Sequence, residues 1–242
     1  MEVTLCFDFG NSRKKCAVFN GRNVQEVVVL ADDTLETIQD LINRFQPKKS
    51  ILSSVIAHNP EMETLLAKTT RFHRLSASSK LPITTPVGKP ETIGADRLAI
   101  CSAAVDQFPG THTLAIGLGT CITYNYTNNR HEFLGGSISP GMQMRFRAMH
   151  EQTALLPLVE AASDFPLIGY DTRTNLLSGV ILGMAKEIDG IIDAYALKYS
   201  NFNVLLTGGD MPFFVPHLKN KIFADPNLIF KGLYAISEQN NH

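Results

Sequence analysis

The sequence predicts an α/β fold built from two similar halves with a cleft between them. Each half opens with three short apolar segments separated by turn residues, and each then alternates helical and strand patterns. A glycine-containing turn follows the first predicted strand of both halves. The chain has 242 residues, 44% of them hydrophobic, which suffices for two modest cores. We place the boundary at the turn Pro109-Gly110, giving halves 1–109 and 110–242.

Three strands joined by tight turns are predicted at the start of the first half. Apolar segments at residues 3–9, 15–19 and 24–30 are separated by Gly10-Asn11-Ser12 and Asn20-Gly21, which are turn sequences. The remaining elements, in order, are a helix at 34–45 stopped by Pro47, a strand at 51–56, a helix at 60–68 that begins with proline, a proline-rich loop at 81–90 and a helix at 94–108.

The second half repeats this plan. Strands are predicted at residues 113–118, 121–126 and 130–134, followed by a helix at 141–152. A long helix at 174–199 carries a continuous apolar side. The closing elements are a strand at 203–206 that runs into Thr207-Gly208-Gly209-Asp210, a strand near 228–230 and a short helix from 233.

Composition excludes several classes of protein. The net charge is −1, from 22 basic and 23 acidic residues, and no basic stripe indicates nucleic-acid binding. The four cysteines form no C-x-x-C pair, which is typical of buried reduced thiols in a cytosolic protein, and the histidines lack the spacing of zinc ligands. No signal segment or membrane span is recognised. We therefore expect a soluble cytoplasmic protein without nucleic-acid or membrane partners.

The sharpest local feature is the turn that follows the first strand. An acidic side chain at a strand end can hold hydrated magnesium, while turn N–H groups and a serine hydroxyl can cradle phosphate. The residues concerned are Asp8, Phe9, Gly10, Asn11 and Ser12, with Arg13, Lys14 and Lys15 adding positive charge. A plain hairpin capped by the aspartate explains this segment equally well when it is taken alone.

Two further glycine turns follow predicted strands in the second half. They are Gly117-Leu118-Gly119-Thr120 and Thr207-Gly208-Gly209-Asp210. Glycine lets a phosphate or a flat ring approach the backbone closely. Each turn is a weak signal alone because glycine turns are common, but three of them in this order, each after a strand, are far more specific.

This order resembles the superfamily of actin, hexokinase and the heat-shock ATPases, whose two ribonuclease-H-like halves enclose a nucleotide. A closer resemblance is to the type III pantothenate kinases, and it covers nearly the whole chain. The matching motifs are Asp8-x-Gly10-Asn11-Ser12, Gly94-Ala95-Asp96-Arg97, Gly119-Thr120, Gly135-Gly136-Ser137-Ile138-Ser139-Pro140-Gly141 and Asp171-Thr172 with Ser178-Gly179. The second and fourth of these motifs discriminate the family from the rest of the superfamily.

The resemblance implies transfer of the ATP γ-phosphoryl group to the primary hydroxyl of pantothenate, giving 4'-phosphopantothenate for coenzyme A biosynthesis. Asp96 matches the general base, and Arg97 matches a residue that positions an anionic group. Gly94 and Ala95 complete the substrate motif, and Thr172 matches a substrate contact made from a partner subunit in a homodimer. Without the motif, Asp96-Arg97 would be interpreted as a helix N-terminal carboxylate beside a surface cation.

The resemblance also implies ATP and Mg²⁺ as ligands. Asp8 would carry the magnesium ion directly or through water, and residues 11–15 would surround phosphate. Thr120 with Gly119 matches a second ATP contact, and Gly208 with Gly209 matches the segment that holds adenosine. Residues 135–141 would shape the cleft, with proline opening the helix that follows.

Three positions depart from the family pattern. Gly117 stands where the family has an aspartate associated with potassium or ammonium, Asn125 stands at a second acidic position, and Val87 replaces an aromatic residue of the pantothenate pocket. Another carboxylate, such as Glu132, would have to reach Gly117 to compensate. Three hypotheses remain: an active pantothenate kinase with altered cation dependence, a catalytically impaired homologue that binds nucleotide or pantothenate in a regulatory role, and a kinase for another small hydroxyl substrate.

Overall fold

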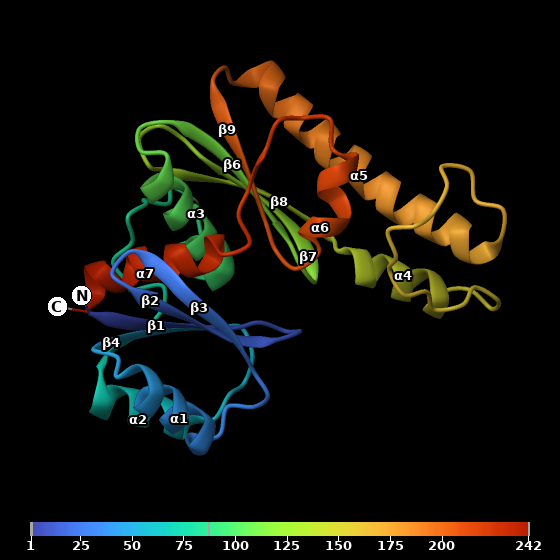
Figure 1. The fold of residues 1–242 in the computed structure, drawn as a ribbon. Coiled ribbons are helices and arrows are strands. Elements are labelled where there is room, and N and C mark those ends of the chain that lie inside the picture. The colour runs from blue at the N-terminus through green and yellow to red at the C-terminus, as the bar shows by residue number, and fades with distance from the viewer. Residues whose placement is uncertain (1, 87, 242) are drawn as a thin grey trace. The chain divides into compact units, whose positions relative to one another are not determined.

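The computed structural model describes residues 2–86 and 88–241, so the departure at Val87 lies outside the described residues. The chain forms two compact units, each described below by itself. The first unit comprises Met1–Gly110, Thr127–Leu134 and Asn227–His242, and the second comprises Thr111–Tyr126 and Gly135–Pro226. Each unit is built on its own five-stranded sheet (Figure 1).

The first sheet has the order β3-β2-β1-β4-β5. Its strands are β1 (Val3–Phe9), β2 (Lys14–Asn20), β3 (Asn23–Leu30), β4 (Lys49–Ser54) and β5 (Arg71–Arg74). The first three strands are antiparallel neighbours joined by tight turns, whereas β4 and β5 run parallel to β1. The sequence predicts all of these strands except β5, which has four residues and no apolar pattern.

Helices cover both faces of this sheet. On one face, α1 (Leu35–Phe45) and α2 (Pro60–Thr69) bury Ile38 and Met62 against the odd-numbered residues of β1. On the other, α3 (Ala95–Gln107) and α7 (Leu228–Asn240) pack on the side of β1 that carries Cys6 (Figure 1). A methyl group at Gly232 would lie 1.8 Å from the Ala99 carbonyl oxygen, so glycine lets α7 approach α3 this closely.

The second sheet has the order β10-β9-β6-β7-β8. Its strands are β6 (His112–Leu118), β7 (Cys121–Thr127), β8 (Phe133–Pro140), β9 (Phe202–Thr207) and β10 (Phe223–Ala224). When β6 is equated with β1, this order matches that of the first sheet, because β9 pairs parallel with β6 as β4 does with β1. The duplicated α/β architecture predicted from the sequence is therefore confirmed.

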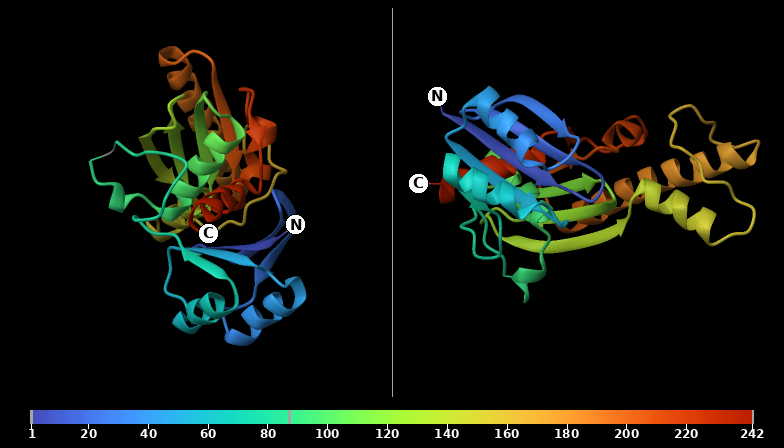
Figure 2. Two further views of the ribbon diagram at one scale, coloured as in Figure 1. Left: turned by 90° about the vertical axis from the view of Figure 1, so that its left-hand side faces the viewer. Right: turned by 90° about the horizontal axis from the view of Figure 1, so that it is seen from below.

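The second unit also contains α4 (Met142–Glu151), the 27-residue α5 (Thr172–Lys198) and the short α6 (Met211–Phe214). Asp171 and Thr174 form a capping box at the start of α5, which explains why the helix begins there. One side of α5 packs on the sheet through Leu177, Ile181 and Ile188, while its first turns extend with α4 and the connecting loop past the strand ends (Figures 1 and 2). Among the described residues, no helix is long and apolar enough to cross a membrane.

Two predicted elements are wrong. The strand predicted at 228–230 is the first turn of α7, and the strand predicted at 130–134 is displaced. β8 instead runs from Phe133 to Pro140 and includes most of the glycine segment 135–141 that was expected to shape the cleft. Gly136 has φ +153° there, and a methyl group on it would lie 1.8 Å from the Tyr124 carbonyl oxygen. These glycines let β8 lie close against β7.

Candidate active site

Asp8 lies near the end of β1 on the face that α3 and α7 cover. In the sheet it is directly opposite Lys15 of β2 and beside Ser53 of β4. Directly paired residues point to the same face, so all three side chains project together. Ser53 is buried, and Asp8 and Lys15 are half-buried. The sequence identified Asp8 and Lys15, but it gave no signal for Ser53, which only the β1–β4 register brings here.

The environment of Asp8 disfavours its charged form. Burial raises the pKa of Asp8 to about 6, the nearby Asp96 carboxylate adds to the increase, and Lys15 opposes it. An effect of Asp96 on Asp8 requires that the two carboxylates lie close together, since charge interactions weaken with distance. Two residues separated by 88 positions in the sequence are thus brought into one site within the first unit.

Asp96 occupies the first turn of α3, and Gly94 caps that helix. A methyl group at Gly94 would lie 2.5 Å from the Asp96 Oδ1 atom, so glycine at this position leaves room for the carboxylate. The Arg97 and Leu98 amides both donate to the Gly94 carbonyl at 3.0 and 3.1 Å, which fixes the backbone around Ala95 and Asp96. The four residues of the motif therefore form a rigid helix start with a half-buried carboxylate.

Arg97 follows Asp96 in α3, and its guanidinium lies over an aromatic ring. Its guanidinium carbon lies 5.3 Å from the centroid of the buried Phe133 ring. A cation–π contact of this kind helps to hold a guanidinium in place over the ring. The arrangement suits a residue that positions an anionic group.

The turn after β1 is tight and open to solvent. The Gly10 amide donates to the Arg13 carbonyl at 3.1 Å, and Asn11, Ser12 and Arg13 are exposed. Phe9 precedes the turn with its ring fully buried in the core between β1 and the α1–α2 face. Phe9 can therefore contribute only its backbone to a phosphate site.

Lys14 points to the opposite face of the sheet from Asp8. Its Nζ atom lies 2.7 Å from Asp33 Oδ1, and this hydrogen bond holds the pKa of Asp33 below its usual range. Asp33 also accepts from the Asn59 amide at 2.8 Å. Lys14 thus ties the turn to the start of α2, a structural link that sequence reasoning missed although the pair Asp32-Asp33 before a helix gave a hint.

The corresponding turn in the second unit contains the exposed residues Gly119 and Thr120 between β6 and β7. The Gly119 amide donates to the Cys121 carbonyl, and the Gly141 amide donates to the Thr120 carbonyl, both at 3.1 Å. A methyl group at Gly141 would lie 2.2 Å from the Gly119 carbonyl oxygen. The end of β8 is therefore pressed against this turn.

The Gly208-Gly209 turn lies beside the end of β6, next to the Gly119–Thr120 turn. Gly117 pairs with Thr207 in the parallel β6–β9 ladder, so the segments after both strands are neighbours. Gly208 has φ +110°, and a methyl group there would lie 2.0 Å from the Leu118 carbonyl oxygen. The structure thus brings together the two glycine turns that the sequence predicts in the second half.

The family's cation position contains no carboxylate here. Gly117 is buried and has no side chain, and the buried Asn125 amide donates to the Ala115 carbonyl at 3.1 Å and to Thr123 Oγ1 at 3.2 Å. Glu132 accepts instead from Asn128 and Arg130 in the β7–β8 turn. Within the part of the chain that the structure describes, no group of three His, Cys, Asp or Glu side chains could hold a metal ion.

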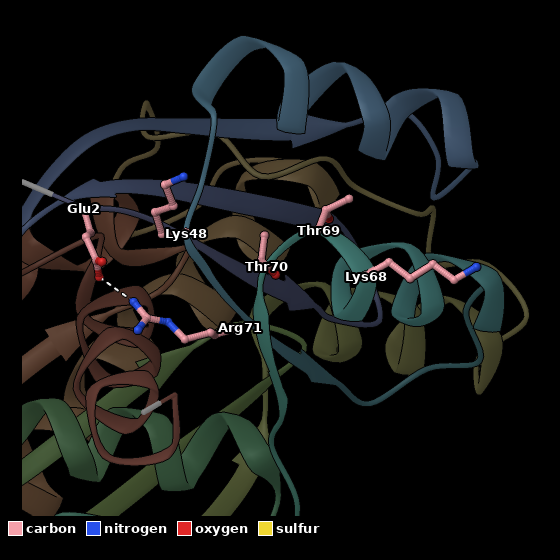
Figure 3. Close-up of a pocket in the computed structure, with 6 residues that line it drawn as sticks. All are labelled: Glu2, Lys48, Lys68, Thr69, Thr70 and Arg71. Carbon is pink, nitrogen blue, oxygen red and sulfur yellow. Dashed lines mark hydrogen bonds and ion pairs between the residues drawn. The ribbon is translucent and has the colours of Figure 1, made fainter.

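Thr172 is the exposed first residue of α5, directly after the Asp171 cap. Its side chain is therefore accessible to solvent in the single chain. A separate pocket of about 430 Å³ lies at the C-terminal end of α2, where the Glu2–Arg71 ion pair is found (Figure 3). No predicted site residue lines that pocket, and its lysines point in different directions (Figure 3).

Comparison with known proteins assigns the chain to a family. The family model of type III pantothenate kinases matches residues 4–194. A type III pantothenate kinase of Christiangramia forsetii is 40% identical over 240 residues, covering 98% of this chain and 99% of that protein. One from Bacteroides fragilis is 40% identical over 243 residues, covering 99% of each.

A solved glucokinase from an Antarctic psychrotroph shares the fold, with a TM-score of 0.51, 10% identity and coverage of 98% of this chain and 99% of that one. At this identity the likeness concerns the architecture alone, and it agrees with the duplicated sheets described above. The family model covers most of the chain, and the relatives match it from end to end, so this chain belongs to the type III pantothenate kinase family.

Proposed function

We propose that this chain is a kinase that uses ATP to phosphorylate pantothenate to 4'-phosphopantothenate, the first step of coenzyme A biosynthesis. The observation that carries the proposal is the electrostatic interaction of two carboxylates in the first unit: the charge of Asp96 raises the pKa of Asp8, which lies two residues before the turn that starts at Gly10. A kinase needs one acidic group near the phosphates and another near the acceptor hydroxyl. A protein that only bound nucleotide would not need the second.

Asp96 is the proposed general base. Its carboxylate accepts the proton of the primary hydroxyl as the hydroxyl oxygen attacks the γ-phosphorus, and the bond from that phosphorus to ADP breaks. The rigid start of α3 holds the carboxylate in one position, because Gly94 and the two amide bonds to its carbonyl fix the backbone. Arg97, whose guanidinium lies over the Phe133 ring, binds the substrate carboxylate.

Asp8 is the proposed magnesium residue, acting directly or through water. Its surroundings fit a divalent cation, because a cation would offset both the burial and the Asp96 charge that raise the pKa of Asp8. Magnesium, when bound, neutralises charge on the transferring phosphoryl group. Lys15, on the same face of the sheet, supplies a further positive charge.

The ATP contacts are proposed to come from three glycine-containing turns. The exposed turn of residues 10–13 offers backbone N–H groups and the Ser12 hydroxyl to phosphate. The Gly119–Thr120 turn supplies the second phosphate contact, and Gly208-Gly209 supplies the surface for adenosine. The adjacency of the last two turns supports their action on one ligand.

The residues at the monovalent cation position do not fit such an ion. Gly117 offers no side-chain oxygen, and the Asn125 NH₂ group, itself a donor, already occupies the Ala115 carbonyl and Thr123 hydroxyl. We expect turnover that does not depend on potassium or ammonium.

A homodimer is the proposed assembly. The loop between α4 and α5 exposes Leu155, Leu167, Ile168 and Tyr170, with 92%, 78%, 83% and 81% of their surface accessible. An apolar groove of about 630 Å³ adjoins this loop along α5. Clusters of this kind mark protein interfaces, and pairing here would bring Thr172 to a neighbouring molecule. A soluble enzyme of the cytoplasm, without nucleic-acid or membrane partners, is the accompanying proposal.

Release of ADP, coupled to a spectrophotometric reporter, tests the function. We expect release that depends on pantothenate and is equal in potassium and in sodium buffer. Nucleotide binding without ADP release would identify an impaired regulatory homologue, and release with another hydroxyl compound but not pantothenate would identify a different kinase. Turnover that requires potassium would contradict the expected cation independence alone.

A further inference from the structure

Arg145, in the first part of α4, makes an unusual set of contacts for a helix arginine. Its Nε donates to the Pro140 carbonyl at 2.9 Å, and Nη2 donates to Ser139 Oγ at 3.0 Å. Nη2 also forms an ion pair with Glu187 of α5. One guanidinium therefore connects the end of β8 to the middle of α5.

Glu187 is itself held in place from the sheet. The hydroxyl of Tyr124 on β7 donates to Glu187 Oε1 at 3.2 Å, and burial together with this carboxylate raises the pKa of the Tyr124 hydroxyl, which stays protonated as a donor. About a quarter of each side chain of the Arg145–Glu187 pair is exposed. Charged hydrogen bonds shielded to this extent constrain geometry more strongly than surface ion pairs do.

The segment to which Arg145 is hydrogen-bonded, the end of β8, packs against the Gly119–Thr120 turn. Directly after Pro140, the Gly141 amide donates to the Thr120 carbonyl, and a methyl group on Gly141 would lie 2.2 Å from the Gly119 carbonyl oxygen. Any displacement of residues 139–141 must therefore displace the turn. Helix α4 begins at the next residue, so Arg145 fixes the point where strand, turn and helix meet.

We propose that Arg145 and Glu187 are positioning residues that hold the Gly119–Thr120 turn in the geometry that binds ATP. The inference rests on the proposed function of that turn. Neither residue lies on the turn itself, and they act through the carbonyl of Pro140 and the amide of Gly141. If Arg145 only neutralised the charge of Glu187, it would need no contact with β8. Its hydrogen bonds to the Pro140 carbonyl and to Ser139 Oγ therefore indicate that it positions the end of this strand.

Arg145→Met, Arg145→Lys and Glu187→Gln test the inference through separate KM values for ATP and pantothenate and through calorimetric binding of a non-hydrolysable ATP analogue. Loss of the Arg145 contacts should raise the KM for ATP and weaken binding of the analogue, each by roughly tenfold. The KM for pantothenate should change less than about twofold. Lysine pairs with Glu187 but cannot reach the same acceptors in a fork, so Arg145→Lys should not restore ATP affinity.

Asp193→Asn is the matched control, because it breaks another ion pair of α5, with Lys219 at 2.6 Å, that contacts neither residues 139–141 nor Arg145. It should leave both KM values unchanged. Thermal unfolding of each variant separates misfolding from repositioning, and Glu187→Gln keeps the side-chain shape if Arg145→Met folds poorly. Folded variants with unchanged ATP affinity, or full restoration by lysine, would overturn the inference. An inactive parent protein would instead count against the proposed function.

Discussion

The carboxylate of Asp96, in the first turn of α3, lies close enough to Asp8 on β1 to add to the rise in the pKa of Asp8. Folding therefore brings two acidic groups together and removes one of them from water. Such an arrangement costs stability unless a cation is present, and it is typical of sites kept for function rather than for folding. Several measurable consequences follow from it.

Asp8→Asn should stabilise the protein at neutral pH. The pKa of Asp8 is about 6 in the folded chain against 3.8 as the ordinary value, so the folded state binds more protons between these pH values. The stability of the parent protein should consequently fall as pH rises from about 4 to about 6. The variant lacks this loss and should be more stable by about 1–3 kcal/mol above pH 6, with no difference below pH 4.

Urea unfolding without magnesium at several pH values measures this difference. Asp40→Asn, which makes the same substitution at an exposed aspartate of α1, is the control. If the free energy of unfolding had the same pH dependence in the parent protein and in the Asp8→Asn variant, the pKa of Asp8 would not be raised by folding.

Magnesium binding should depend on pH through the same group. A cation bound by Asp8 must displace its proton, so the apparent affinity should weaken about tenfold for each pH unit below about 6. Calorimetric titration with MgCl₂ in the presence of an ATP analogue, performed in buffers of different ionisation enthalpy, would count the protons released. Binding that is constant between pH 5 and pH 7 would exclude Asp8 as the magnesium residue.

Gly208→Ala should destabilise the second unit by more than about 2 kcal/mol. Its φ of +110° disfavours any side chain, and the added methyl would meet the Leu118 carbonyl oxygen at 2.0 Å. The adjacent Gly209→Ala is the matched control for stability, because no atom lies within 4 Å of its added methyl. Equal unfolding midpoints for the two variants would contradict the packing of this turn against β6.

Asn125→Asp should make the chain sensitive to cations. The variant places a carboxylate against the Ala115 carbonyl and removes the NH₂ donor, which should cost about 2–4 kcal/mol in a buried position. Potassium chloride should recover more of the unfolding temperature than choline chloride does. An unchanged unfolding temperature would show that this amide is not required to satisfy the strand.

Ile168→Glu should weaken the proposed dimer. The side chain is 83% accessible in the single chain, so the substitution has little effect on folding, but a charge within an apolar interface is costly. Sedimentation should show a lower average mass than that of the parent protein at the same concentration. Leu35→Glu, at an exposed apolar residue of α1 in the first unit, is the control. A parent protein that sediments as a monomer would refute the assembly.

Much of the fold can be predicted from the sequence because most elements have strong local patterns. Strand β1 and helix α5 have continuous apolar residues or a clear periodicity, with turns or caps at their ends. The strand predicted at residues 228–230 was wrong because three apolar residues in a row fit a strand or a helix equally well. Strand β8 was displaced because Gly135 and Gly136 indicate a turn locally, whereas Gly136 lies within the strand and in close contact with Tyr124 of β7.

The candidate site could be predicted only in part. Its motifs identified Asp8 and Asp96, but their proximity depends on the packing of α3 against the sheet, which no local pattern encodes. Two sets of contacts depend on side-chain directions that residue spacing does not reveal. They are the ion pair of Lys14 with Asp33 and the hydrogen bonds of Arg145 to the end of β8. Charged residues in strand and helix interiors were therefore assigned by residue type, and their partners could not be predicted.

Pantothenate-dependent ADP release by Asp96→Asn, measured beside calorimetric ATP-analogue binding, tests the central claim most directly. Loss of the base should lower turnover by about 10²–10⁴-fold while the analogue binds within about twofold of the parent value, because the amide keeps the shape but cannot accept the proton. Turnover of the variant equal to that of the active parent protein would contradict the assignment of Asp96 and the mechanism built on it.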